Sequence, residues 1–433
     1  MRRKTRIDQI QARIGKRKLI WFGTRSTDAR ALFEIPQFSE IFSIIAPINS
    51  GKVQEVSLEA LKKQRVDLDL YSLDIDSSNE AIELRRVMSQ SMKSPTAVVT
   101  YRPGNFFTSL YYPNIEHVQY LGLFHEQQAP FEHKPWVESE LKKIGIPVIP
   151  WKYYNTENFN SARSNNWPVV VRANRSDGGT GLSLVENPDE LIKFRPKEYG
   201  KFIGVAPFME PNIPLNVNAC VFPNGSVSIH SLSFQMIGIK ELTNRQFGYC
   251  GNDFSVVKDL DLSLISDLEK IVILIGKWLS EHGYRGAFGI DLLVFKEKLF
   301  LTEINPRFQG SSDVSAKMNQ LIDRSDIFLE HMAAFLNLQS PKTISLRDIL
   351  DEQLSLSQVI LHNINNRVVQ LGKLPEKEIT SEHKLDLLPN NDILIQPDAV
   401  LCRFVVDGSA TQDGHKLTDS LQQEVLKTNL LYT

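Results

Sequence analysis

Cysteine is scarce in this sequence of 433 residues. Its three cysteines, Cys220, Cys250 and Cys402, form no CxxC pair, so neither a disulfide framework nor a structural zinc site is indicated, and a reducing cytoplasm fits. Long apolar runs are also missing: none approaches the roughly 20 residues that span a bilayer, and we expect no membrane protein. The net charge of −2 argues against a general nucleic-acid binder.

Two common catalytic signatures are missing as well. No GxGxxG follows the first apolar run, where Gly23-Thr24-Arg25 stands, so we interpret this tripeptide as a packing or substrate contact rather than a dinucleotide site. The nine histidines show no HExxH or other ligand spacing. We therefore expect His125, His133 and His230 to be surface or core residues and not catalytic bases.

Positive charge gathers near the N-terminus, where residues 1–18 carry eight lysines and arginines but no apolar segment typical of a secretory signal. We interpret this segment as a solvated basic helix or a frayed end. The alternative is contact with a membrane surface or a partner.

What is present is the composition of a globular protein, with 42% hydrophobic and 23% charged residues. The length predicts two or three domains. In residues 1–125 short apolar runs alternate with helical stretches, which predicts a doubly wound parallel sheet with crossover helices. The expected strands are 19–22, 42–45, 68–73, 97–101 and 118–123, and the expected helices are 58–63 and 79–91.

A second unit is predicted over residues 126–330, followed by a small α+β cap over 331–433. The second unit contains a long amphipathic helix at 264–282. Residues 240–254 form a polar, glycine-spaced stretch that we interpret as a loop. The expected strands of the cap are 356–362, 392–396 and 400–406.

The segment from Gly289 to Arg307 reads as two buried strands joined by a charged turn at residues 296–298. With a three-residue turn, Asp291 lies opposite Glu303, and Asn305 shares the face of Glu303. Two opposed carboxylates repel unless a cation lies between them, and this all-oxygen set suits Mg²⁺. A two-residue turn would instead separate the carboxylates onto opposite faces. An ordinary hairpin with its charges in solvent is the other alternative.

A glycine-rich turn is predicted at residues 176–181, between two apolar strands. Gly178, Gly179 and Gly181 allow strained backbone conformations, and successive N–H groups there can bind phosphate oxygens. Arg172 precedes the turn at a strand end and offers a bidentate fork for phosphate. An ordinary hairpin turn remains the alternative.

These patterns together resemble the ATP-grasp superfamily of carboxylate–amine ligases. Four segments carry the resemblance in the family's order, and they span about half of the chain. They are Phe131–Pro150, Pro168–Leu182, Val205–Glu210, and Gly286–Val294 with Thr302–Arg307. The family usually places a doubly wound domain before them, as is expected here.

The resemblance implies roles for individual residues. Arg307 would support the transferring phosphate or a substrate carboxylate, and Arg245 would bind a substrate carboxylate unless it lies in a solvated loop. The nucleotide and metal set is Lys134 and Arg172 on the ATP phosphates, Gly178, Gly179, Thr180 and Gly181 closing over them, Phe208 and Met209 around adenine, and Asp291, Glu303 and Asn305 on Mg²⁺ or Mn²⁺.

Two positions depart from the family pattern. Arg172 stands where lysine is usual, which keeps the charge but changes its reach. No acid occupies the usual ribose position after the hinge, and Glu210 is our substitute. We expect Asn216 and Asn218, at that position, to be outward-facing strand residues.

The expected function is ATP-dependent ligation of a small-molecule carboxylate to an amine through an acyl phosphate, giving ADP and phosphate. Biotin-carboxylase-like carboxylation is one alternative, although no biotin-carrier segment is seen. A non-catalytic ATP-binding module is the other. A homodimer is the base-rate expectation for the assembly.

Overall fold

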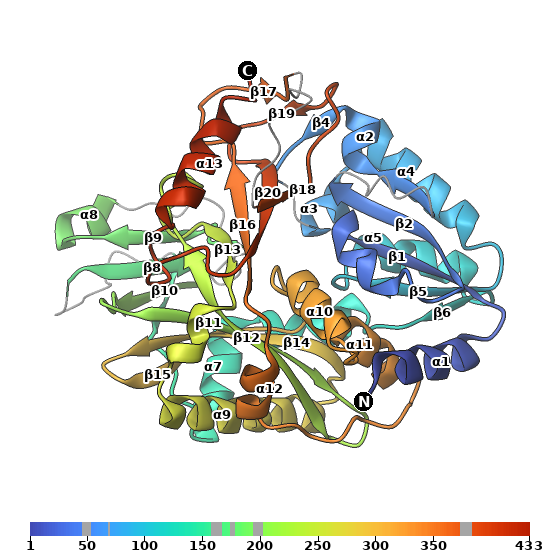
Figure 1. Ribbon diagram of the computed structural model, residues 1–433, viewed down its shortest axis with the longest axis horizontal. Helices are drawn as coiled ribbons and strands as arrows, with labels where there is room; N and C mark the ends of the chain where they lie inside the picture. The colour runs from blue at the N-terminus through green and yellow to red at the C-terminus, as the bar shows by residue number, and fades with distance from the viewer. Residues whose placement is uncertain (46–52, 68–69, 157–166, 174–177, 194–201, 373–382) are drawn as a thin grey trace.

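The computed structural model describes the chain except for residues 46–52, 68–69, 157–166, 174–177, 194–201 and 373–382. Figure 1 shows a parallel sheet built from the N-terminal part beside antiparallel sheets built from the rest of the chain. This arrangement confirms the predicted α/β and α+β fold class, whereas the domain boundaries stay predictions. In the part that the structure describes, no helix is long and apolar enough to cross a membrane.

The N-terminal sheet has the strand order β3-β2-β1-β5-β6, and its strands are parallel. Its strands are mostly buried because helices cover a parallel sheet. The elements are β1 (Lys18–Arg25), η1 (Ser26–Leu32), β2 (Phe38–Ile45), β3 (Gln54–Ser57), α2 (Leu58–Lys62), β4 (Gln64–Arg65), α3 (Leu70–Ile75), α4 (Asn79–Ser91), β5 (Thr96–Thr100), α5 (Asn105–Tyr111), η2 (Tyr112–Asn114) and β6 (Val118–Tyr120).

One expected strand of this region is wrong. Within residues 68–73, the described part belongs to helix α3, and the edge strand is instead β3. The run is short and mixes polar with apolar residues, so its periodicity fits a helix as well as a strand. Asp74 in α3 accepts a hydrogen bond from the Phe106 amide at 2.6 Å, which ties α3 to the start of α5.

The basic N-terminal segment forms helix α1 (Arg3–Ile14), but it is not simply solvated. Arg3 and Arg6 are buried, at 3% and 0% exposure. Arg3 pairs with Asp326, and the Arg6 Nη2 atom lies 2.8 Å from Glu330. A fully solvated or frayed segment is therefore wrong for these two residues, because α1 docks on the main body through buried ion pairs.

The central sheet has eight strands in the order β15-β14-β11-β12-β13-β16-β20-β18. The strands from the C-terminal region thus extend the sheet that carries the predicted metal hairpin, and α9 packs across β11, β12 and β15. The strands are β11 (Ile213–Val221), β12 (Val227–Ile237), β13 (Tyr249–Asp253), β14 (Gly286–Phe295), β15 (Lys298–Asn305), β16 (Leu356–His362), β18 (His383–Asp386) and β20 (Val400–Asp407). The helices after β6 include α6 (His125–Gln128), η3 (Ala129–Glu132), α7 (Lys134–Lys143), η5 (Val256–Asp259), α9 (Leu262–Glu281), α10 (Ser312–Leu321), α11 (Ile327–Phe335), α12 (Leu346–Glu352) and α13 (Asp419–Asn429).

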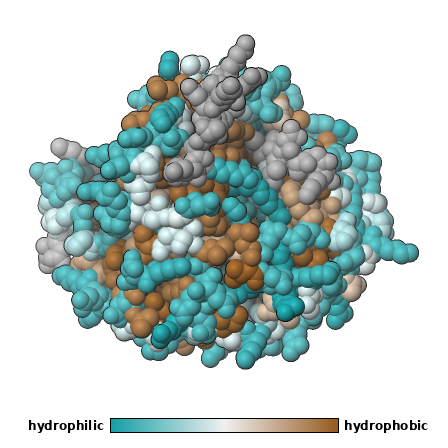
Figure 2. All heavy atoms as spheres, viewed as in Figure 1, coloured by the Kyte–Doolittle hydropathy of each residue, from teal (hydrophilic) through white to brown (hydrophobic). Residues whose placement is uncertain are grey.

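Two smaller sheets complete the described fold. A four-stranded sheet in the order β7-β10-β8-β9 lies apart from the N-terminal sheet, as Figure 1 shows, and β4 joins β17 and β19. Hydrophilic residues cover much of the face in Figure 2, and hydrophobic residues gather toward its middle. The elements are β7 (Lys152–Asn155), β8 (Val169–Ala173), β9 (Leu182–Val185), α8 (Pro188–Lys193), β10 (Phe202–Pro207), β17 (Val369–Gln370) and β19 (Leu394–Ile395).

Candidate active site

A cavity of about 690 Å³ is lined by residues of the N-terminal, four-stranded and central sheets, and this volume suits a small-molecule ligand. Gly181 lies beside it, between the lining residues Thr180 and Leu182. The other predicted site residues all line it: Lys134, Arg172, Gly178, Gly179, Thr180, Phe208, Met209, Glu210, Arg245, Asp291, Glu303, Asn305 and Arg307.

The hairpin of β14 and β15 brings the two carboxylates together by an unexpected route. Phe295 pairs with Lys298, so the turn has two residues and the expected three-residue turn is wrong. Both turn residues have positive φ, as a tight hairpin of this kind requires. A bulge at Thr302 then shifts the register by one residue, so Asp291 does pair with Glu303 as predicted.

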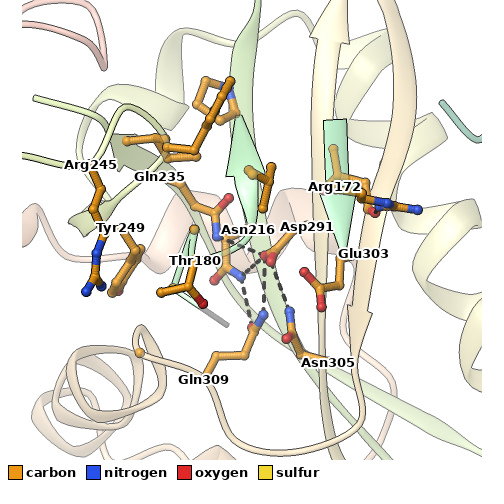
Figure 3. A pocket seen from close by; sticks show the side chains of 18 of the residues that line it. Arg172, Thr180, Asn216, Gln235, Arg245, Tyr249, Asp291, Glu303, Asn305 and Gln309 are labelled. Atoms are coloured by element: carbon orange, nitrogen blue, oxygen red, sulfur yellow. Dashed lines mark hydrogen bonds between the residues drawn. The ribbon is translucent and has the colours of Figure 1, made fainter. Parts of the chain in front are cut away.

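Neutral amides surround the carboxylate of Asp291 (Figure 3). Its Oδ1 atom accepts hydrogen bonds from Asn216 Nδ2 at 2.7 Å and from Gln235 Nε2 at 2.9 Å. A longer bond of 3.3 Å comes from Gln309 Nε2, and Asn305 Nδ2 donates to Oδ2 at 2.9 Å. The carboxylate is therefore held in place by several donors that bring no charge of their own.

The same surroundings raise the pKa of Asp291 to about 6. Loss of solvent contributes most, and repulsion by Glu303 adds to it. Hydrogen bonds from Asn216 and Asn305 act in the opposite direction but do not cancel the effect. A cation between Asp291 and Glu303 would remove the repulsion.

The two cations predicted for phosphate binding are both paired with acids. Lys134 begins helix α7, and its Nζ atom lies 2.6 Å from Glu303 Oε1. Arg172 from β8 contacts Glu138 and the Tyr153 hydroxyl, and its guanidinium carbon lies 3.8 Å from the Trp151 ring centroid. Both cations are thus held in place at the cavity wall without a ligand.

In the described part of the glycine-rich turn, the three glycines adopt the positive-φ backbone conformations that other residues rarely adopt. Gly178, Gly179 and Gly181 have φ values of 56°, 82° and 74°. A Cβ atom on Gly179 would lie 1.8 Å from the carbonyl oxygen of Phe247, so only glycine fits. Residues 176 and 177 of the predicted turn lie outside the described residues.

The prediction of a loop over residues 240–254 is wrong for its last part, because Tyr249–Asp253 forms strand β13. Arg245, just before it, pairs with Asp67 and lies 3.9 Å from Asp398. Arg307 donates to the Phe308 carbonyl at 3.0 Å, and its Nε atom lies 4.0 Å from Glu132.

The predicted nucleotide hinge follows β10. The Phe208 amide donates to the Pro168 carbonyl at 2.9 Å, and the rings of Phe208 and Phe247 meet edge to face. Asn212 Nδ2 donates to the Met209 carbonyl at 2.5 Å, and Glu210 is exposed at the cavity rim. These hydrogen bonds hold the backbone of the hinge at Phe208 and at Met209.

Sequence reasoning missed several polar residues behind the carboxylates. Asn216 and Asn218 were expected to face outward, but both are 1% exposed. Asn216 pairs with Asp291 across β11 and β14, and Asn218 Nδ2 donates to Ser311 at 2.9 Å. The one available signal was a pair of asparagines, two residues apart, inside an otherwise apolar strand. Gln235 and Gln309 had no comparable signal.

Comparison with known proteins adds a family match. Residues 132–311 match the model of the ATP-grasp domain. The carbamoyl phosphate synthase large chain from Pyrococcus furiosus is 24% identical over 260 residues, which are 58% of this chain and 24% of that protein. The matches span about a quarter or less of the length of the first curated relatives.

Two solved structures share the fold over most of their length. A biotin carboxylase from Campylobacter jejuni, solved in a β-γ-ATP complex, has a TM-score of 0.63 at 16% identity and covers 90% of this chain and 87% of its own. The N5-carboxyaminoimidazole ribonucleotide synthetase from Thermotoga maritima has a TM-score of 0.56 at 16% identity, with coverages of 96% and 99%. At these identities the likeness is one of fold.

Proposed function

We propose that this chain, whose residues 132–311 match the model of the ATP-grasp domain, is an ATP-dependent carboxylate–amine ligase. A substrate carboxylate oxygen attacks the γ-phosphorus of ATP, the bond from that phosphorus to the ADP oxygen breaks, and an acyl phosphate forms. The nitrogen of an amine then displaces phosphate, losing a proton, and an amide results. The pairing of Asp291 with Glu303, in one cavity with Lys134 and Arg172, carries this proposal.

The residues present fit a divalent cation. Asp291, Glu303 and Asn305 would hold Mg²⁺, or Mn²⁺ in its place, through two carboxylates and an amide oxygen. Among the described residues no three His, Cys, Asp or Glu side chains gather into a metal site, so such an ion would need further oxygens from phosphate or water. When bound, the ion would offset the negative charge of the phosphates.

The remaining residues bind, orient and shield the substrates. Lys134 contacts Glu303 without a ligand, so we expect it to exchange that carboxylate for a phosphate when nucleotide enters. Residues 178–181 would close over the phosphates and exclude water, which the acyl phosphate requires because it hydrolyses readily. Phe208 and Met209 would contact adenine, and Glu210 would lie near the ribose.

A phosphate-release assay over pools of amino acids, other carboxylates and amines tests this function. The wild-type protein should release phosphate only with a productive pair and Mg²⁺. Glu303→Ala should be slower by about 100-fold or more, because it removes a carboxylate ligand of the divalent ion that would offset the charge of the phosphates. Glu281→Ala, at the exposed end of α9, is the matched control and should keep full activity.

The other outcomes of this assay identify the alternatives. Turnover that depends on bicarbonate and biotin, with no amine requirement, would indicate carboxylation. Nucleotide binding without turnover on any pair would indicate a non-catalytic module. Either result contradicts the ligase proposal.

A further inference from the structure

The cavity extends beyond the proposed metal residues to the edge of the N-terminal sheet. Strands β1 and β5 are neighbours there, and the strand order reverses between them. Open parallel sheets bind ligands outside the carboxyl ends of the strands at such a point. Thr24 and Arg25 at the end of β1, and Tyr101 just after β5, line the cavity at this position.

Arg25 is placed to meet a ligand with one edge of its guanidinium group. The side chain is buried, and its Nε and Nη2 atoms each lie 3.3 Å from an oxygen of Asp28. Its hydrogen bonds to described residues go to Asp28 alone. The guanidinium carbon lies 6.0 Å from the Tyr101 ring centroid. Because the group has five N–H donors in a planar fork, the Nη1 edge stays available to a second acceptor.

Tyr249 connects this end of the cavity to the proposed reaction centre. Its side chain lines the same cavity and is close enough to both Arg25 and Asp291 for electrostatic interaction. Gln358 Nε2 donates to its hydroxyl at 2.9 Å, which holds the ring in place. Arg25, Tyr249, Asp291 and Glu303 therefore line one cavity, which a single substrate can occupy.

The charges behind Arg25 favour a ligand group with a single negative charge. Asp28 neutralises Arg25 in part, and Asp313, whose charge also acts on Arg25, lies 2.6 Å from Arg403 Nη2. Arg403 also pairs with Asp386 at 2.7 Å, and Arg30 contacts both Asp386 and Asp313. The three arginines and three aspartates of this network sum to zero formal charge. A carboxylate with one charge therefore suits the free edge better than a phosphate with nearly two.

We propose that Arg25 binds a carboxylate that takes no part in the reaction, so that one substrate is an amino acid or a dicarboxylic acid. This inference rests on the proposed ligase function and narrows its substrate class. A free carboxylate beside the amine identifies an amino acid as the nucleophile. A second carboxylate beside the reacting one identifies a dicarboxylic acid as the acyl donor. Arg25 is then a specificity-determining residue of the N-terminal sheet.

Isothermal titration calorimetry on the full chain, loaded with Mg²⁺ and a non-hydrolysable ATP analogue, tests the inference without turnover. The probes are the proteinogenic amino acids with their carboxamides, and dicarboxylic acids with their monoamides. We expect at least one acid to bind about tenfold or more tightly than its amide, since an arginine–carboxylate pair is charge-assisted. Arg25→Met should abolish this preference, and Arg86→Met, exposed on α4, should retain it.

Loss of Arg25 leaves Asp28 buried without its partner, so the double variant Arg25→Met/Asp28→Asn is tested beside it. Unchanged affinity for the ATP analogue shows that a variant is folded. Equal binding of acids and amides, or an unchanged preference in both variants, would overturn the inference, as would failure of every acid to bind. The phosphate-release assay fails or succeeds separately, because it requires turnover and this titration does not.

Discussion

At the scale of single residues, Asp291 is a carboxylate whose hydrogen-bond donors among the described residues are neutral side-chain amides. Glu303 faces it across the hairpin. Burial and repulsion by Glu303 raise its pKa to about 6, so keeping it ionised there costs free energy. Binding sites often carry such perturbed groups because a ligand later compensates them.

This cost predicts a pH-dependent effect of Asp291→Asn on the metal-free protein. The folded pKa of about 6 exceeds the ordinary value of 3.8, so the folded state binds more protons between these pH values, and Asp291 costs stability as the pH rises through that window. At pH 8 the variant should be more stable than the wild type by about 1–3 kcal/mol, and the gain should vanish near pH 4. Urea unfolding at both pH values measures it. The control is Asp267→Asn, an exposed carboxylate on α9, and an equal gain there would refute the explanation.

At the scale of elements, the glycine turn and the segment before β13 fit each other closely. The carbonyl oxygen of Gly178 accepts a hydrogen bond from the Tyr249 amide at 3.4 Å, and Gly179 lies against Phe247. The turn residues and the opposite wall therefore set the width of the cavity together. A side chain at the contact would push them apart.

Two alanine substitutions separate this contact from backbone strain. Gly179→Ala combines a φ of 82° with a clash at 1.8 Å and should weaken binding of the Mg²⁺–ATP analogue by about tenfold or more. Gly178→Ala has a φ of 56° but no atom within 4 Å of the new Cβ, so it should cost only about 1–2 kcal/mol of stability. Calorimetric affinity and thermal unfolding distinguish the two effects. Similar nucleotide affinity for both variants would mean that the turn does not shape the site.

Elements were predictable from the sequence where local pattern decides them. Helix α4 and strand β16 have the predicted bounds, Asn79–Ser91 and Leu356–His362. The hairpin was predicted with the right pairing for the wrong reason, since the bulge at Thr302 compensates the shorter turn. Periodicity alone does not locate a bulge, and the mixed run at 68–73 left the choice of element open.

At the scale of the whole molecule, the cavity is assembled from segments far apart in the chain. Arg25, Arg172 and Asp291 come from three different sheets. The residue types of the site were readable from its motifs, but the amides that surround Asp291 were not. Their role depends on strand pairing such as that of Asn216 with Asp291, which is a property of the assembled sheet.

The central claim is that Asp291, Glu303 and Asn305 hold a divalent ion together with a nucleoside triphosphate. Calorimetric titration of a non-hydrolysable ATP analogue, with and without Mg²⁺, tests it most directly in the wild type and in Glu303→Ala. We predict that Mg²⁺ tightens binding to the wild type by about tenfold or more and has little effect on the variant. Equal dependence on Mg²⁺ in both proteins, or no nucleotide binding to the wild type, would contradict the account.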